Sequence, residues 1–591
     1  MRRALEVGRH LVLLCRAAAR NAGEDPLLLA VQAARRLPRR LAEPAARVIG
    51  AGTGGAGVRD ALAAFVADRP DAAVARLSAT PRPRTRLGRR LAWELAVQLG
   101  LTESVECIGD ERRIAGARGG EDVPALTRAR AAWQRGDVTG AAVLAGRAPA
   151  GVRYRERLES ERATMLPGFR LSAPERPSRP PSRSDEPRAL HLLTNSLPHT
   201  RSGYSVLSHS VLRSQRQAGI AVEAVTRIGY PVTVGLPLAR GADRVDGVTY
   251  RRVTPASLAA APAERLAQMV RHVVRLAETF QPTVVHTTTN YTNALVAEAV
   301  ARATGLPWVY EVRGQLEKTW LASRPPAERD AAERSERYGL LRAKETEMVL
   351  AADHVVTLSE TMRADLLARG ADPARVTVVP HAIDSRHLAA PLSPPEARAR
   401  LGLPVEGFWV GSVSSLVDYE GLDILLDAVA RLRRRGLDVR AAIVGDGVSR
   451  PSLLAATRRL GIEDASVLPG RVRLEKAALW HRALDVFAVP RRDLPVCRAV
   501  TPLKPIEAMA AGRAVVASDL PALAEIITGP GAGLLVPPED AKALADTLAR
   551  LVSDPQLLTE LAEAGRSYAS DRTWHVTGSA YRTLYERLSG E

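Results

Sequence analysis

The chain has 591 residues, 46% of them hydrophobic and 25% charged, which is typical of a soluble globular protein with more than one core, and three domains are expected. The formal net charge is +18, nearly all from arginine, and such a charge favours acidic partners such as a membrane surface, nucleic acid or a phosphorylated substrate. Aromatic residues make up only 4%, which argues against binding of single-stranded nucleic acid by base stacking, so we expect no nucleic-acid partner.

Three widely spaced cysteines form neither a disulfide framework nor a metal-ligand pattern, so we expect a reducing cytoplasm and no metal site. No apolar run approaches the roughly 18 residues that a spanning helix needs. Residues 1–20 place basic residues around a short apolar core and are interpreted as a core-facing helix, with a signal peptide or a helix lying on a membrane as alternatives. The expected location is cytoplasmic, with peripheral contact at the inner membrane surface left open.

The first 165 residues are rich in alanine and arginine and have helical spacing with almost no strand pattern, which predicts an all-α region. The predicted helices are 3–20, 26–37, 59–68, 71–77, 89–99, 124–135 and 138–145. Two helix–turn–helix units lie about twice a roughly 33-residue period apart and resemble degenerate tetratricopeptide hairpins. Such a region binds a protein partner or packs against an enzyme. The glycine-rich segment 52–57 is interpreted as a flexible linker, because no strand precedes it and no Lys-Ser/Thr follows.

Residues 166–188 are rich in proline, serine and charge, which predicts an extended linker. From Ala189 onward strands and helices alternate, which predicts parallel sheets with helices on both faces. We expect one α/β domain over residues 189–387, a second over 388–572, and a terminal helix over 573–591.

Four residues of the first α/β domain lie at or beyond the ends of predicted strands and are candidates to line a ligand cleft: Gly203, Tyr204, His286 and Arg313. A small residue in the first strand–helix loop lets the backbone approach a ligand, although a tight turn alone is the alternative for Gly203. A core or surface position is the alternative for His286 and Arg313. The charged segment 324–337 is interpreted as a solvated helix.

The most informative stretch is 489–519, VPRRDLPVCRAVTPLKPIEAMAAGRAVVASD, which predicts a buried strand, a loop, a helix over 502–511 and another strand. Ligands of parallel sheets bind where such a loop meets the helix N-terminus. We expect Thr501 to cap the helix, and the free amides of Thr501, Leu503 and Lys504 to favour a diphosphate. Lys504 adds a full positive charge.

Glu507, one helical turn beyond Lys504, begins the motif Glu-Ala-Met-Ala-x-Gly, which ends at Gly512. This motif resembles the nucleotide-sugar site of the retaining GT-B glycosyltransferases, the large family 4-like group of sucrose synthases and bacterial mannosyltransferases. That family has a first glutamate where this chain has Ala499. Residues 502–507 resemble the Pro-x-Lys-x-x-Glu variant that some members have.

The resemblance implies two Rossmann-like domains, with the donor bound mainly to the second domain and the acceptor to the first. It implies that Glu507 holds the ribose hydroxyls, while Lys504, Arg471 and Arg491 stabilise the departing diphosphate. The first two strands of the second domain and their loops contribute further candidate donor contacts: Gly411, Ser415, Gly445, Asp446 and Gly447. The family also implies that the terminal helix crosses back to the first domain.

Two residues of this second domain depart from the family pattern, because Ser415 and Glu420 stand where typical members have Arg and Lys. The function expected is a retaining, metal-independent hexosyltransferase without a cofactor. It would use a nucleoside-diphosphate sugar as co-substrate and a glycan, lipid-linked or cell-envelope acceptor. The alternatives are a non-catalytic GT-B scaffold that binds nucleotide or glycan, motivated by Ala499, Ser415 and Glu420, and a nucleotide-sugar epimerase.

Overall fold

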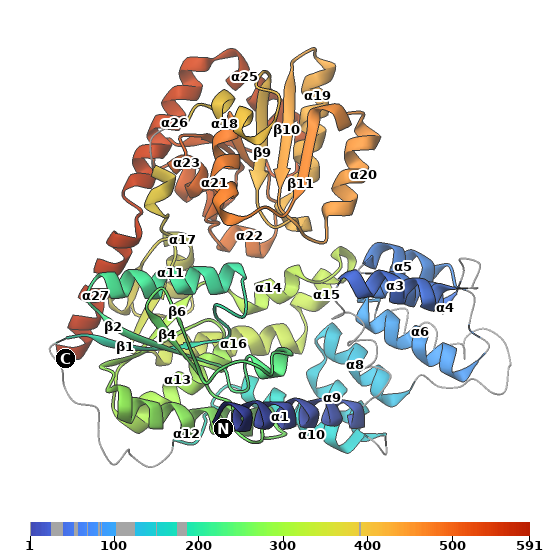
Figure 1. Cartoon of the computed structure of the whole chain (residues 1–591), viewed down its shortest axis with the longest axis vertical. Helices are drawn as coiled ribbons and strands as arrows, with labels where there is room; N and C mark the ends of the chain where they lie inside the picture. Colours follow the sequence, from blue (N-terminus) through green and yellow to red (C-terminus); the bar gives the residue numbers. More distant parts are fainter. Residues whose placement is uncertain are drawn as a thin grey trace.

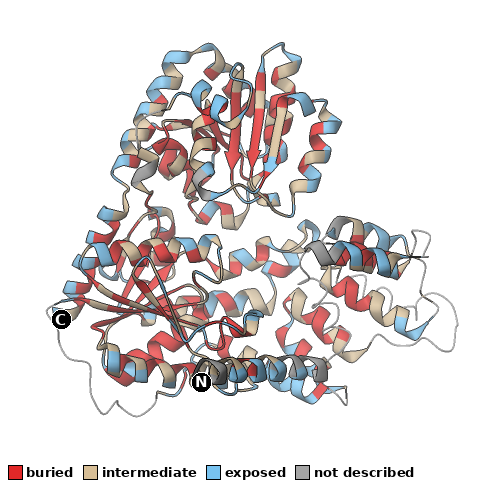
Figure 2. Ribbon diagram, viewed as in Figure 1, coloured by how far each residue is buried: buried red, intermediate tan, exposed pale blue. Residues whose placement is uncertain are grey.

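The computed structural model describes residues 2–24, 39–51, 57–67, 69–80, 83, 85–101, 124–148, 151–173, 186–388 and 392–590. Two α/β domains lie one above the other, and the N-terminal helices lie beside the lower one (Figure 1). Buried residues are concentrated on the strands and on the helix faces that cover them (Figure 2). The predicted helix 26–37 and residues 52–56 of the glycine-rich segment lie outside the described residues.

The first α/β domain contains an eight-stranded sheet with the order β3-β4-β2-β1-β5-β6-β7-β8, in which only the β3–β4 pair is antiparallel. Its strands are β1 Arg188–Leu193, β2 Ala221–Thr226, β3 Ala242–Val245, β4 Val248–Arg252, β5 Val284–Thr288, β6 Trp308–Val312, β7 His354–Thr357 and β8 Val376–Val378. The strand order reverses between β1 and β5, so this domain has a topological switch point there.

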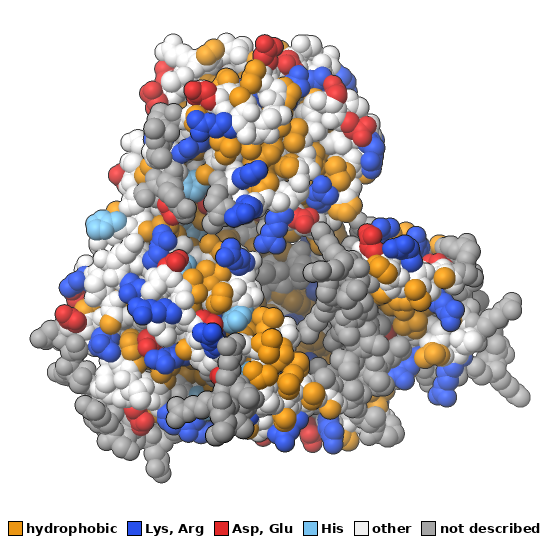
Figure 3. Space-filling view, in the orientation of Figure 1, with side chains coloured by type: hydrophobic (Ala, Val, Ile, Leu, Met, Phe, Trp, Pro, Cys, Tyr) orange, Lys and Arg blue, Asp and Glu red, His pale blue; other side chains and the backbone are white. Residues whose placement is uncertain are grey.

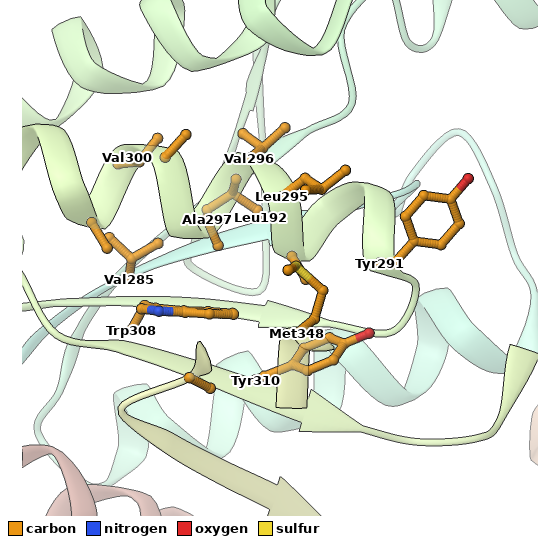
Figure 4. Close-up of a cluster of buried hydrophobic side chains, with 14 of the residues drawn as sticks. Leu192, Val285, Tyr291, Leu295, Val296, Ala297, Val300, Trp308, Tyr310 and Met348 are labelled. Carbon is orange, nitrogen blue, oxygen red and sulfur yellow. The ribbon is translucent and has the colours of Figure 1, made fainter. Parts of the chain in front are cut away.

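The helices of this domain are α11 Gly203–Gln217, α12 Pro262–Phe280, α13 Tyr291–Thr304, α14 Leu316–Ala322, α15 Arg329–Glu333, α16 Glu336–Ala351 and α17 Glu360–Ala368. Helix α13 is buried over most of its length and packs on the sheet with α12 and α16 around it. Figure 4 shows side chains of α13 facing Val285 and Trp308 of the sheet, with Met348 of α16 beside them.

The second α/β domain contains six parallel strands with the order β11-β10-β9-β12-β13-β14, which reverses between β9 and β12. Its strands are β9 Phe408–Val413, β10 Val439–Val444, β11 Ser466–Gly470, β12 Val486–Val489, β13 Ala514–Ser518 and β14 Gly533–Val536. Its helices are α18 Pro394–Leu401, α19 Leu422–Arg434, α20 Arg450–Leu460, α21 Leu474–Ala483, α22 Pro495–Ala499, α23 Lys504–Ala510, α24 Pro521–Ile527, α25 Ala541–Ser553 and α26 Pro555–Ser570. This order places the switch point at the carboxyl ends of β9 and β12.

The N-terminal region is helical wherever it is described, with α1 Arg2–Glu24, α3 Arg39–Gly50, α4 Val58–Val66, α5 Pro70–Ser78, α6 Arg86–Gln98, α8 Ala125–Arg135, α9 Val138–Gly146 and α10 Val152–Met165. Val138, Met165 and Leu171 belong to the core of the first α/β domain. Residues 166–173, predicted as the start of an extended linker, therefore pack on that domain, and residues 174–185 lie outside the described residues.

The charged segment 324–337 is largely solvated, as its composition predicts, but it is not one continuous helix. It forms a short turn at Pro326–Glu328, then α15, and then the start of α16. The guanidinium of Arg337 lies over the rings of Trp133 and Trp320, at 5.2 and 5.5 Å. These stacking contacts hold the Arg337 end of the segment against the N-terminal helices, while most of residues 326–334 stay exposed.

The last helix, α27 Trp574–Gly590, leaves the second α/β domain and packs against the first (Figure 1). Its buried residues Tyr581, Leu584 and Tyr585 join Val211 and Leu212 of α11 in one hydrophobic cluster. Helix α27 is therefore part of the core of the first α/β domain.

Candidate functional site

The loop after β12 begins at the switch point of the second sheet and leads into two short helices, α22 and α23. Helix α23 begins at Lys504, with Leu503 in the N-cap position and Pro505 in the first turn. Thr501 does not cap it, contrary to the prediction, because the helix begins two residues later than predicted. The Thr501 Oγ1 atom is buried and has no hydrogen-bond partner among the described residues.

Glu507 lies one turn into α23 and is held by two neighbours. Lys504 Nζ donates a hydrogen bond of 2.8 Å to Oε2 of Glu507, and Nε2 of His481 lies 3.5 Å from the same oxygen. Burial alone raises the pKa of the Glu507 carboxyl, but the charge of Lys504 and the contact with His481 outweigh burial and hold this pKa well below its ordinary value. Glu507 is therefore an ionised acceptor, suited to the hydroxyl groups of a sugar.

Three histidines surround Glu507. His481 is fully buried, with Nε2 facing Glu507 and Nδ1 without a hydrogen-bond partner in the described part of the chain; Nδ1 of His381 and of His387 is likewise buried without a partner. Burial lowers the pKa of all three imidazoles, that of His381 to about 4, so they are neutral at pH 7. Together with Thr501, these unpartnered polar atoms fit a site that a polar ligand fills.

The histidines were largely missed at the level of sequence. His387 and His481 lie 94 residues apart in the numbering, in segments without a motif, and only the fold brings their rings to 6.3 Å. His381 lies after β8, in the segment that joins the two α/β domains. A buried histidine near a strand end was the one available signal, and that signal pointed to His286 instead.

Arg491 does not supply the free positive charge that the sequence predicts. Its guanidinium donates two hydrogen bonds to the carboxylate of Glu420, at 2.8 and 3.2 Å, and a third to the carbonyl of Val500. Glu420 is the residue that stands where the family has a lysine. The charges of Glu420 and Arg491 therefore neutralise each other, and the pair brings no net charge to the switch point.

Arg471 follows β11 and is exposed, and it forms no ion pair with any side chain that the structure describes. β11 lies three strand positions from β12, which corresponds to about 14 Å. Lys504 and Arg471 therefore approach the region over β9 and β10 from opposite sides. Lys and Arg side chains also gather along the boundary between the two α/β domains (Figure 3).

Three glycines of the second domain are required by close backbone packing. A Cβ atom would lie 2.0 Å from the carbonyl oxygen of Ala442 at Gly411, 1.8 Å from that of Ser414 at Gly445, and 2.2 Å from that of Leu416 at Gly447. Gly411 is buried within β9, so the structure places it in the core and not in the cleft. Gly445 and Gly447 lie in the loop after β10, where their backbone packs directly against the loop after β9. Of the remaining candidates there, Ser415 is exposed, and Oδ1 of Asp446 accepts a hydrogen bond from the amide of residue 447.

In the first α/β domain, Tyr204 lies at the switch point. Its hydroxyl accepts a hydrogen bond of 3.1 Å from the amide of Thr194 and lies 2.8 Å from Oγ1 of Thr288, so it joins the ends of β1 and β5. Gly203 is exposed at the start of α11, and a Cβ atom there would have no neighbour within 4 Å. The local packing of Gly203 therefore does not require a glycine.

His286 lies in the core of the first domain and does not line a cleft. It is fully buried, Nε2 lies 3.0 Å from Glu311 Oε2, and the hydroxyl of Tyr585 lies 2.7 Å from Nδ1. Arg313 pairs with both oxygens of Glu311, at 2.7 and 3.0 Å, and its charge lowers the pKa of His381 after burial does. Arg313 therefore lies at the end of a buried network, near His381.

Two features are absent from the described residues, a metal-ligand cluster and a membrane-spanning helix. No set of three or more His, Cys, Asp and Glu side chains in this part of the chain is arranged to hold a metal ion. None of the described helices combines the length and the apolar character that crossing a membrane requires.

Known families match both α/β domains. Residues 202–382 match the glycosyl transferase 4-like domain, and residues 407–554 match the glycosyl transferases group 1. Both domains are glycosyl transferase domains. D-inositol 3-phosphate glycosyltransferase of Salinispora arenicola is 33% identical over 261 residues, which cover 41% of this chain and 56% of that protein. The chain thus spans little more than half of that relative's length.

Solved structures share the fold. Sucrose-phosphate synthase of Thermosynechococcus elongatus superposes with a TM-score of 0.55 at 20% identity and covers 68% of this chain and 99% of its own. Anabaena HepE in complex with UDP superposes with a TM-score of 0.52 at 19% identity, covering 68% of this chain and 100% of its own. The predicted GT-B fold, two Rossmann-like domains preceded by a helical region, is confirmed.

Proposed function

We propose that this chain is a retaining glycosyltransferase that moves a sugar from a nucleoside-diphosphate sugar to a glycan, lipid-linked or cell-envelope acceptor. The observation that supports it best is the ionised Glu507, held by Lys504 at the switch point of the group 1 domain. Unpartnered polar atoms of His381, His387 and Thr501 lie around it. A carboxylate that accepts, beside a cation and free polar atoms, suits a nucleotide sugar.

In the proposed reaction, Glu507 accepts hydrogen bonds from the ribose hydroxyls, and the diphosphate lies over β9 and β10. Negative charge develops on the diphosphate as the sugar–oxygen bond breaks, so Lys504 and Arg471, together with the amide of Leu503, stabilise the transition state. These cations take the place of a metal ion. An acceptor hydroxyl approaches from the 4-like domain, past Tyr204, forms the new bond to the sugar carbon on the face that the diphosphate leaves, and passes its proton to the departing diphosphate oxygen.

A thermal-shift screen with UDP, GDP, ADP and TDP tests the donor site, and UDP is the first choice because Anabaena HepE was crystallised with it. A nucleotide at about 100 times its Kd adds roughly 2.7 kcal/mol to the stability of the folded chain. We expect one nucleotide to raise the melting temperature of the native chain, and Lys504→Ala and Glu507→Ala to abolish the rise. Lys542→Ala, on an exposed face of α25, is the control and keeps it. No rise with any of the four would overturn the donor site.

A second candidate is a non-catalytic scaffold that binds nucleotide or glycan. Ala499 lies buried in α22 where the family has a glutamate, and Glu420 neutralises Arg491. Release of labelled nucleotide from the donor that matches the stabilising base separates the two candidates. Release that Lys504→Ala abolishes supports the enzyme, whereas binding without release supports the scaffold.

A further inference from the structure

A groove of about 580 Å³ opens where three parts of the chain meet. One wall comes from the N-terminal helices, a second from the segment between α14 and α15 of the 4-like domain, and a third from the loop after β9 of the group 1 domain. The groove lining includes Gln98, Gln134, Ser323, Arg324, Asp418 and Tyr419.

The N-terminal wall is fixed to the 4-like domain. The amide and hydroxyl of Thr139 donate to the two carboxylate oxygens of Glu336, at 2.7 and 2.6 Å. The amide of Arg337 donates to the carbonyl of Gly136 at 2.9 Å, in the turn between α8 and α9. These contacts, with the stacking of Arg337 on two tryptophans, make α8 and α9 part of the rigid domain.

Helix α6 is joined to α8 by a buried ion pair. The carboxylate of Glu94, which is 0% exposed, pairs with the guanidinium of Arg130 and also accepts a hydrogen bond from Thr127. Removing one partner from such a pair is costly, so it fixes the register of the two helices. The end of α6, with Gln98, is therefore presented to the groove on a rigid support.

Two polar atoms of the groove residues are buried without partners. Nε of Arg324 and Oε1 of Gln134 have no hydrogen-bond partner in the described part of the chain. A different nitrogen of Arg324, Nη1, donates to the main-chain carbonyl of Gln134 at 3.2 Å. The Arg324 guanidinium also lies over the ring of Trp320 at 5.5 Å, so its orientation is fixed. Two residues of the groove lining thus carry a buried donor and a buried acceptor whose hydrogen-bonding capacity the described residues leave unused.

The groove lies close to the cleft between the two domains. Helix α14 begins just beyond Arg313, which lies near His381, and ends at Ala322 in the groove wall. Its 7 residues span about 10 Å. It packs against α22, the helix that precedes the donor loop. A chain bound in the groove would therefore begin about one short helix away from the reacting sugar.

We propose that this groove binds the carbohydrate chain of the acceptor, an inference that rests on the proposed function. Sugar hydroxyls both donate and accept, which matches the unpartnered Arg324 Nε and Gln134 Oε1. Sugar rings also have apolar faces, which match the ring of Tyr419 and the prolines beside Arg324. The charged lining residues are Arg324, Arg329 and Asp418, and this mixture is less basic than a polyanion site requires. The N-terminal region then serves acceptor recognition.

A glycan array of bacterial oligosaccharides, probed with the full chain, tests this inference. We expect binding to a subset of saccharides and a loss of at least about tenfold in the double variant Gln98→Ala/Gln134→Ala, because a tenfold change is only 1.4 kcal/mol. Ser323→Trp, which fills the groove, should weaken binding to the same saccharides. Gln556→Ala, an exposed glutamine on α26, is the matched control and should bind as the native chain does.

The nucleotide-induced thermal shift is measured on the same variants. If it persists in all of them while the double variant and Ser323→Trp lose glycan binding, the groove and the donor site are separate and the inference holds. If no saccharide binds, or if the groove variants bind as well as the native chain, the inference is overturned even when the nucleotide shift is intact. If no nucleotide raises the melting temperature of the native chain, the proposed function is overturned instead.

Discussion

The carboxylate of Glu420 accepts two hydrogen bonds from the guanidinium of Arg491, and both side chains are nearly buried, with exposed fractions of 13% and 10%. Glu420 by itself places a negative charge in a loop that faces a proposed diphosphate. The pairing removes that objection, because the charge is neutralised within the domain. Lys504 and Arg471 are the cations on which the proposed donor site depends.

Removal of one partner from this pair should destabilise the chain. Glu420→Ala leaves the buried charge of Arg491 uncompensated, and we expect a loss of about 3 kcal/mol in the free energy of unfolding, measured by urea denaturation. Asp546→Ala, which breaks an exposed pair with Arg435, is the control and should cause little change. The double variant Glu420→Leu/Arg491→Met should regain most of the loss. A single variant as stable as the native chain would contradict the role of the pair.

Glu345 should give the stability of the chain a measurable pH dependence. Its carboxylate is 5% exposed and accepts hydrogen bonds from the Tyr291 amide and the Tyr310 hydroxyl. Burial raises the pKa of Glu345 from 4.5 to about 7, more than these hydrogen bonds lower it. Between these two values the folded chain binds a proton that the unfolded chain does not, so stability falls as the pH rises through this window.

The difference in the pKa of Glu345 corresponds to roughly 3 kcal/mol between about pH 4.5 and pH 7. We therefore expect Glu345→Gln to lose less stability than the native chain when urea denaturation at pH 5 is compared with that at pH 8. Glu463→Gln, an exposed position, serves as the control and should follow the native profile. Parallel profiles for the native chain and Glu345→Gln would show that Glu345 does not titrate in this window.

Two glycines that the sequence treats alike should respond differently to the same substitution. Gly445 has φ of 146°, and a Cβ atom there would meet the carbonyl oxygen of Ser414 at 1.8 Å, so Gly445→Ala should cost at least about 1–3 kcal/mol and weaken nucleotide binding. Gly203→Ala meets no atom within 4 Å and should leave the melting temperature nearly unchanged. Equal melting temperatures for the two variants would contradict the close packing described for the loop of Gly445.

Sequence reasoning found the elements but not their long-range partners. The alternation of strands and helices predicts the parallel sheets. The position of Lys504 and Glu507 after a buried strand predicts that they lie beyond the carboxyl end of that strand, and in the structure they lie on α23, after β12. His286 lies within the buried strand β5, but its partner Tyr585 lies 299 residues away on a helix that crosses from the other domain. No local pattern reports such a contact.

The same limit applies to charges. Composition predicts a strongly basic protein, and spacing places Arg491 near the donor loop. The residue that neutralises it, Glu420, lies 71 residues away after a different strand. Whether an arginine is free or paired depends on which loops the strand order brings together, and that order becomes visible only in the folded chain.

The buried network beneath Arg313 leads to a last prediction. The hydroxyl of Tyr585 lies 2.7 Å from Nδ1 of His286 and accepts a hydrogen bond of 3.0 Å from Nε2 of Gln215. Tyr585→Phe removes both bonds and leaves two buried polar atoms unpaired, so we expect a loss of about 1–3 kcal/mol in the free energy of unfolding. Gln215→Leu alone should also destabilise the chain, because it leaves His191 without its partner.

A double-mutant cycle distinguishes this network from simple packing. If Tyr585 and Gln215 act through their shared hydrogen bond, Tyr585→Phe costs less in the Gln215→Leu background than in the native chain, since one of the two bonds is already absent. Urea denaturation of the four proteins measures the difference. Equal costs in both backgrounds would mean that the hydroxyl of Tyr585 stabilises the chain without help from Gln215, through its contact with His286.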